Sequence, residues 1–208
     1  MISTLPEVKS FVEPDQVYPN CFGAFTLPDE YEERFLDHSY WISEQVPATK
    51  LHLPLNRADH IRGHLTYYRL LDRKGSELLE IAQTIAVCGQ AVAGEPMKLV
   101  GFKEMRYKGK GYLMLDAHKL KHLLRFHLDL EEAFDIPQVD PAYDLHLTLK
   151  ILESEQAHEE YHNASRQIRA RLEPENWEFP ITNFGLFGWV PGGPRHPVQL
   201  VNIPLDRV

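Results

Sequence analysis

The tripeptide His-Leu-Thr occurs twice in this chain, at positions 64–66 and again at 146–148. Each copy lies in a short apolar segment with the composition of a strand, and each of these segments stands between two helical ones. The same strand, with the same polar residues, therefore recurs once in each half of a 208-residue chain. We expect a protein built from two equivalent lobes, each contributing one copy.

Strand geometry decides which side chains of the two copies act together. Successive side chains on a strand point to opposite faces, so the histidine and threonine of each copy share a face. The leucine between them points to the other face and suits a core. If the two strands lie near a twofold axis, the two polar rows face each other across a groove. The predicted rows consist of His64, Thr66 and Tyr68 in one lobe and His146, Thr148 and Lys150 in the other.

The rest of the chain alternates between strands and helices, with hairpins in place of uniform βαβ units, which favours the α+β class. No low-complexity or Pro/Gly/Ser-rich linker divides it. We therefore expect a loosely held arm over 1–15 and one bilobal domain over 16–208, with two sheet-and-helix lobes flanking a central groove. Strands are predicted over 17–27, 63–71, 97–107, 111–116, 144–152, 177–190 and 198–205, and helices over 28–45, 76–87, 118–134 and 154–172.

Composition narrows the function classes. The chain is 43% hydrophobic and 25% charged, which is typical of globular proteins. It contains no apolar run long enough to span a membrane, no secretory signal pattern, and only two cysteines, so a reducing cytoplasm is the expected location. The net charge of -8 argues against binding long duplex nucleic acid, which needs a broad basic face. A small or short anionic substrate remains compatible with it.

The chemistry of the two polar rows suits a phosphodiester. Imidazole has an ordinary pKa of about 6.5, so one ring accepts a proton from water while the other donates one to the leaving oxygen. Hydroxyl groups and an ammonium group stabilise the charge that develops on the non-bridging oxygens. A single His-x-Thr in a strand is usually structural, but two copies, one in each lobe, favour a catalytic pair.

The motifs HLTYY and HLTLK resemble those of the two-histidine phosphoesterase superfamily, which includes the 2′-5′ RNA ligases and RNA 2′,3′-cyclic phosphodiesterases. CFGAFTLPDEYEERF is similar to the family's first strand and helix, and VQLVNIPL to a closing strand, so the resemblance covers about residues 17–205. It implies a bilobal α+β fold in which the histidines are general base and general acid and the threonines hold the phosphate. These roles fall on His64, His146, Thr66 and Thr148, with the order of base and acid left open.

The expected function is metal-independent hydrolysis of 2′,3′-cyclic phosphates of nucleotides or short RNA, without a cofactor and with weak reverse 2′-5′ ligation. An alternative keeps the chemistry but takes 2′-5′ linked or cyclic oligonucleotide signals as substrate. A non-catalytic nucleotide-binding module is the alternative of another class. The sequence assigns no oligomeric state.

Further substrate-binding candidates are aromatic and cationic residues near the predicted groove. The densest basic cluster is formed by three lysines and an arginine with two tyrosines interleaved, a combination that holds a phosphate and stacks a base: Lys103, Arg106, Tyr107, Lys108, Lys110 and Tyr112. A solvated hairpin is an equally good interpretation of that cluster. With Tyr68 and Lys150, the candidates are Arg106, Tyr112, Trp189 and Arg195.

The sequence HEEYH at 158–162 matches the zinc peptidase pattern His-Glu-x-x-His. Its helix is polar on almost every side, whereas a catalytic zinc helix is normally buried beneath the active site. No third ligand follows at a suitable spacing. We therefore interpret these histidines as part of a solvated helix face and predict no metal site.

Overall fold

A computed structural model describes residues 9–52, 63–118, 121–134, 145–193 and 196–205. Within these residues, one antiparallel sheet of nine strands has the order β1-β9-β8-β2-β3-β6-β5-β4-β7. The strands are β1 (Lys9–Ser10), β2 (Val17–Thr26), β3 (His64–Lys74), β4 (Pro96–Tyr107), β5 (Lys110–Ala117), β6 (His146–Leu152), β7 (Asn176–Pro180), β8 (Asn183–Gly188) and β9 (Val198–Pro204). The α-helices are α1 (Asp29–Gln45), α2 (Gly75–Cys88), α3 (Lys121–Phe134) and α4 (Glu155–Leu172), and the 3₁₀ turns are η1 (Pro47–His52) and η3 (Gly89–Ala91).

Local sequence explains where the helices begin. Helix α1 follows Pro28 and carries acidic residues in its first turn, which the positive end of the helix dipole favours. The Ser154 hydroxyl caps α4 by accepting a hydrogen bond from the Ala157 amide, as its sequence suggests. Helix α2 begins at Gly75, and there the Glu77 carboxylate accepts a hydrogen bond of 2.7 Å from the Lys74 amide.

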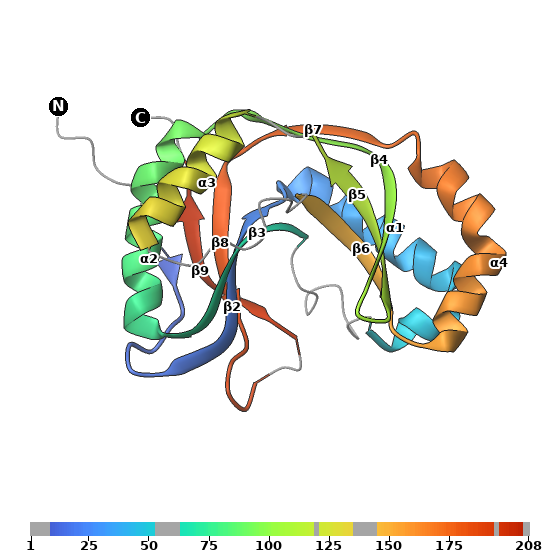
Figure 1. The fold of residues 1–208 in the computed structure, drawn as a ribbon, viewed down its shortest axis with the longest axis horizontal. Coiled ribbons are helices and arrows are strands. Elements are labelled where there is room, and N and C mark those ends of the chain that lie inside the picture. Colours follow the sequence, from blue (N-terminus) through green and yellow to red (C-terminus); the bar gives the residue numbers. More distant parts are fainter. Residues whose placement is uncertain (1–8, 53–62, 119–120, 135–144, 194–195, 206–208) are drawn as a thin grey trace.

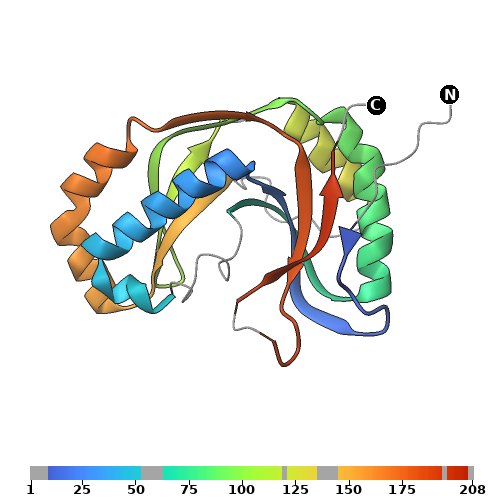
Figure 2. The same ribbon diagram turned by 180° about the vertical axis from the view of Figure 1, so that it is seen from behind.

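The sheet divides into two lobes (Figures 1 and 2). The first lobe comprises β1, β9, β8, β2 and β3, and the second comprises β6, β5, β4 and β7. Helices α2 and α3 flank the first lobe, whereas α1 and α4 flank the second. The α+β class and the two-lobed arrangement expected from the repeated motif are therefore confirmed.

Two helices cross from the lobe of the preceding strand to the other lobe. Helix α1 follows β2 of the first lobe, yet its Tyr31 ring packs against Trp177 and Phe179 of β7 in the second lobe. Helix α3 follows β5 of the second lobe, yet the Tyr67 hydroxyl of β3 donates a hydrogen bond to the Leu123 carbonyl oxygen of α3. Each lobe is therefore covered in part by a helix that follows a strand of the other lobe in the chain.

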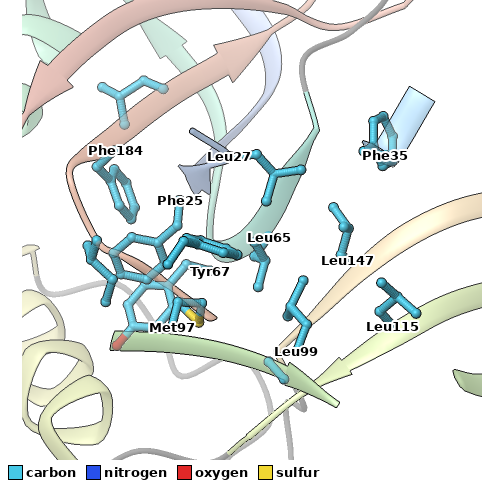
Figure 3. Close-up of a cluster of buried hydrophobic side chains, with 14 of the residues drawn as sticks. Phe25, Leu27, Phe35, Leu65, Tyr67, Met97, Leu99, Leu115, Leu147 and Phe184 are labelled. Carbon is cyan, nitrogen blue, oxygen red and sulfur yellow. The ribbon is translucent and has the colours of Figure 1, made fainter. Parts of the chain in front are cut away.

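The lobes share one hydrophobic core. The strands β3 and β6 meet at the pair Leu65 and Leu147, both fully buried. Figure 3 shows both leucines within a cluster that extends from Phe184 of the first lobe to Leu115 of the second. The leucines between the polar residues of each motif are core residues, as strand alternation predicted.

Two segments differ from the sequence-based expectation. The strand predicted over 177–190 is two strands: β7 pairs with β4 in the second lobe, and β8 pairs with β2 in the first. Within the arm expected to be loosely held over 1–15, β1 pairs with β9, and the Phe11 amide donates a hydrogen bond of 2.9 Å to the Leu200 carbonyl oxygen. Among the described helices, none is both long and apolar enough to cross a membrane.

Candidate active site

The two motifs lie side by side at the junction of the lobes. The antiparallel pairing of Leu65 with Leu147, continued by one residue each way, sets His64 beside Thr148 and Thr66 beside His146. The histidines thus occupy one diagonal of a four-residue square and the threonines the other, with about 7–8 Å between backbones along a diagonal. All four side chains are half-buried. We call the sheet face that carries them the site face, and the opposite face the core face.

Equivalent backbone hydrogen bonds anchor the strand before each histidine. The Leu27 amide donates to the Gly63 carbonyl oxygen at 3.1 Å in the first lobe, and the Ala117 amide donates to the Leu145 carbonyl oxygen at 3.0 Å in the second. The Gly63 amide also donates to the carboxylate of Glu32 on α1, at 2.8 and 2.9 Å. A Cβ at Gly63 would lie 2.7 Å from the Leu27 side chain, so a larger residue there would force that side chain to shift.

Each motif is followed by a β-bulge at the same position. Opposite β2, the register skips Tyr67, the residue after Thr66. Opposite β5, it skips Leu149, the residue after Thr148. A bulge adds one residue to a strand and reverses the face on which later side chains lie. The polar row of His146 and Thr148 therefore ends at Thr148.

The bulge places Lys150 elsewhere than strand alternation predicted. Lys150 pairs with Leu113, a core residue, and only 8% of its surface is exposed. Burial lowers the pKa of its ammonium group from 10.5 to about 8. No hydrogen bond or ion pair joins it to another residue that the structure describes. Lys150 thus lies on the core face, and the expectation that it extends the polar row of His146 and Thr148 is wrong.

The neighbouring strands complete the site face with a different residue in each lobe. Thr26 of β2 lies across from His64, whereas Asp116 of β5 lies across from His146. Asp116 also pairs with the Lys103 ammonium group of β4 at 3.2 Å. The surroundings of the two histidines therefore differ in charge.

Small and apolar residues lie beside the two threonines. Ala24 is across from Thr66, and Met114 is across from Thr148. Both are fully buried, yet neither belongs to the main hydrophobic core. Their position opposite the threonines puts them on the site face, beside the polar side chains.

Two aromatic rings pack against one side of His64. The Phe22 ring lies 5.3 Å from the His64 ring, and the Phe187 ring stacks on it at 5.0 Å. The two phenyl rings also stack on each other, at 5.2 Å with 8° between their planes. Phe187 is fully buried and Phe22 is half-buried, so the stack fixes the orientation of His64 from one side.

Two of the other predicted binding residues lie on opposite faces of the β4–β5 hairpin. Tyr112 lies across from Ile151 and two residues from Met114, on the site face. Arg106 lies across from Gly111. A Cβ at Gly111 would point toward the His158 ring of α4, on the core face, so Arg106 lies on that face of the hairpin too. The Arg106 side chain is exposed.

The structure describes the remaining predicted binding residues only in part. Trp189 follows β8 and its amide donates to the Pro19 carbonyl oxygen at 3.3 Å. Tyr68 belongs to β3, but its side chain lies outside the described part of the structure, as does the whole of Arg195.

Sequence reasoning missed the residues that neighbouring strands bring to the motifs. Asp116 and Thr26 lie directly across from the histidines, and Phe22 packs on one of them, but nothing in their local sequence marks them. Arg69 was missed for another reason. The bulge at Tyr67 brings it across from Phe22, onto the site face. Only the pairing of neighbouring strands brings Asp116 and Thr26 beside the motifs, and the bulge that places Arg69 leaves no clear signal in the sequence.

Other candidate chemistry lies away from this face. Burial raises the pKa of the Cys21 thiol to about 11 and also raises that of Cys88, which makes both poor nucleophiles. In the HEEYH segment, His162 is exposed on α4 and His158 lies near Gly111. Among the described residues, no three His, Cys, Asp or Glu side chains are grouped to hold a metal ion.

Comparison with known proteins identifies the fold. No protein-family profile and no curated protein matches the sequence. Among solved structures, TT0787 of Thermus thermophilus superposes with a TM-score of 0.57 and 21% identity, over 90% of this chain and 98% of that one. E. coli LigT in its apo form gives 0.54 and 14%, over 92% and 99%. E. coli LigT complexed with 3′-AMP gives 0.54 and 15%, over 91% and 99%. The fold expected from the two motifs is confirmed.

Proposed function

We propose that this chain, which has the LigT-like fold of the two-histidine phosphoesterases, is a metal-independent phosphodiesterase that hydrolyses 2′,3′-cyclic phosphates of nucleotides or short RNA. The observation that carries the proposal is the square formed by the two motifs. Two groups able to transfer protons lie on one diagonal and two hydroxyl groups on the other. A phosphate above the centre of this square has a histidine on each of two opposite sides.

The arrangement suits in-line displacement at phosphorus. One histidine accepts a proton from water as the water oxygen forms a bond to phosphorus. The other histidine donates its proton to the ribose oxygen as the bond between that oxygen and phosphorus breaks. One proton is taken up and one is released, so the products are a phosphomonoester and a free hydroxyl group. The same geometry run in reverse joins a hydroxyl group to a cyclic phosphate, which is weak ligation.

The threonines contribute hydrogen bonds in the transition state. Thr66 and Thr148 lie on the other diagonal, where their hydroxyl groups donate to the non-bridging oxygens as negative charge grows there. Burial of Ala24 and Met114 beside them limits water at the floor of the site. Lys150 has no part in this scheme, because it lies on the core face.

Ligands of the structural neighbours support a nucleotide substrate. E. coli LigT has been solved with 3′-AMP, with NADP+ and with ATP, each time with a fold similar to this chain. A 2′-5′ linked or cyclic oligonucleotide remains the alternative substrate, since it requires the same chemistry. A binding module without turnover is the alternative of another class, but it has no need of two histidines placed on one diagonal.

The test is an assay with a panel of 2′,3′-cyclic mononucleotides, RNA with a cyclic phosphate end, and 2′-5′ linked oligonucleotides, each with EDTA present. We expect hydrolysis of the cyclic phosphates to survive the chelator. His64→Ala and His146→Ala should each lower kcat at least a hundredfold, since general acid–base catalysis contributes about 10²–10⁴. His158→Ala is the matched control and should retain wild-type activity.

Three results would contradict the proposal. Full activity in either motif variant would remove that histidine from the mechanism. Loss of activity with EDTA, or in His158→Ala, would favour the zinc hypothesis. Nucleotide binding without turnover of any substrate in the panel would favour the binding module.

A further inference from the structure

Beyond the four motif residues, the next row of the site face differs between the lobes. In the first lobe this row holds Phe22 of β2 and Arg69 of β3, which lie across from each other. In the second lobe it holds Tyr112 of β5 and Ile151 of β6. Both lobes offer an aromatic ring at this position, but only the first adds a positive charge.

Arg69 is an exposed cation without an acidic partner among the described residues. The other cation identified on this face, Lys103, is already paired with Asp116. In a chain with a net charge of -8, an arginine beside the candidate site that has no acidic partner among the described residues marks a place for a bound anion.

The aromatic rings next to Arg69 indicate what kind of anion. Phe22 is half-buried and packs on Phe187 and His64, so its ring is held in place and partly accessible. An aromatic ring beside a cation is the combination that proteins use to bind a nucleotide of a single strand, with the base or ribose on the ring and the phosphate on the cation.

Distance along the strand supports a second phosphate. Ala24, across from Thr66, and Phe22, across from Arg69, are two residues apart on β2, which is about 7 Å. The Arg69 side chain starts one row beyond the motif. When one phosphate of a nucleotide lies between the histidines, this side chain is long enough to reach a second phosphate on the far side of the nucleoside.

We propose that Phe22 and Arg69 form a subsite for the nucleotide next to the scissile phosphate, and that Arg69 binds that nucleotide's second phosphate. The inference rests on the proposed function for the position of the scissile phosphate. It narrows the substrate class to nucleotides that carry a further phosphate, supplied either by an internucleotide diester or by a 5′-monophosphate.

The experiment compares three substrates: adenosine 2′,3′-cyclic phosphate, the same compound with a 5′-phosphate, and a diadenosine with a terminal cyclic phosphate. Wild-type enzyme should show a higher kcat/KM for the two substrates that carry a second phosphate. Arg69→Gln should remove about tenfold of kcat/KM for these two, mainly through KM, and leave the first substrate unchanged. Unequal loss between the two distinguishes a diester from a 5′-phosphate.

Arg73→Gln is the matched control. Arg73 lies on the same strand, but it pairs with Tyr18, a core residue, and so lies off the site face. Salt dependence gives a second readout. In Arg69→Gln, kcat/KM for the two phosphorylated substrates should fall less steeply with salt concentration than in wild type, because the variant lacks one exposed charge–phosphate contact that salt screens.

Equal effects of Arg69→Gln on all three substrates, or the same effect from Arg73→Gln, would overturn the inference. Binding of adenosine 3′-phosphate and of adenosine 3′,5′-bisphosphate to wild type and Arg69→Gln separates it from the proposed function. Tighter binding of the bisphosphate that depends on Arg69, in a protein that hydrolyses nothing, supports the subsite and refutes the proposed function. Hydrolysis without any preference for a second phosphate supports the proposed function and refutes the subsite.

Discussion

Replacing Lys150 with methionine is expected to stabilise the protein at neutral pH. Burial lowers the pKa of this lysine from 10.5 to about 8, and no described acidic group offsets the cost. Each pKa unit by which the folded and unfolded states differ corresponds to about 1.4 kcal/mol. The charged lysine therefore lowers the free energy of unfolding by about 3 kcal/mol at pH 7. Methionine has a similar shape and no charge, and should recover a large part of this free energy.

The pH dependence follows from the sign of the pKa change. Below pH 8 the lysine is charged in both states and the full cost applies. Between about pH 8 and 10.5 the unfolded state binds more protons than the folded state, so the free energy of unfolding rises with pH. Urea unfolding of wild type and Lys150→Met from pH 7 to 10 should therefore show a difference that shrinks as pH rises. Lys121→Met, at an exposed position on α3, should show no such difference.

A constant difference between wild type and Lys150→Met across this pH range would refute the reasoning, and so would a variant less stable than wild type at pH 7. Hydrolysis provides an independent check. Because Lys150 lies on the core face, the variant should keep wild-type kcat and KM. A large loss of turnover in a stable variant would restore its assignment as a substrate-binding residue.

Three further predictions concern stability, each measured by urea unfolding. Burial lowers the pKa of His38 below 6.5, so the unfolded state takes up a proton first as pH falls, and the free energy of unfolding drops below about pH 6.5. His38→Phe should flatten this decline between pH 8 and 5. An unchanged dependence of the free energy of unfolding on pH would contradict the prediction. Tyr67→Phe leaves the Leu123 carbonyl oxygen without its buried donor and should cost about 1–2 kcal/mol, whereas no change would show that the hydrogen bond contributes little. Gly75→Ala should lower the free energy of unfolding by about 1–3 kcal/mol, because its Cβ would lie 2.1 Å from the Glu13 carbonyl oxygen; a gain would show that this contact relaxes freely.

Strand alternation predicted the centre of the candidate site and failed just beyond it. Two-residue periodicity is reliable within an uninterrupted strand, and Leu65 and Leu147 are buried as it requires. It fails at Lys150 because the bulge at Leu149 inserts one residue. A bulge is stabilised by the partner strand and the packing around it, so a leucine after a threonine does not reveal one.

The residues that lie beside the motifs could not be predicted from the sequence for a related reason. Asp116 lies far from His146 in sequence, and only the pairing of β5 with β6 brings the two together. Repetition of the motif indicated that two lobes exist, but not which strands flank them. Likewise, the predicted strand over 177–190 has a continuous apolar character, and only tertiary pairing divides it between the lobes.

The crossing of α1 and α3 between the lobes bears on how the protein comes apart. The only strand contact between the lobes is one residue pair, which by itself would form a weak hinge in the described structure. Helices α1 and α3, however, each pack on the lobe opposite to the strand that they follow, as the contacts of Tyr31 with Trp177 and of Leu123 with Tyr67 show, so the chain crosses between the lobes at both helices. No single cut in the chain releases an intact lobe. We therefore expect one cooperative unfolding transition, in which the two histidines keep their spacing until the whole molecule melts.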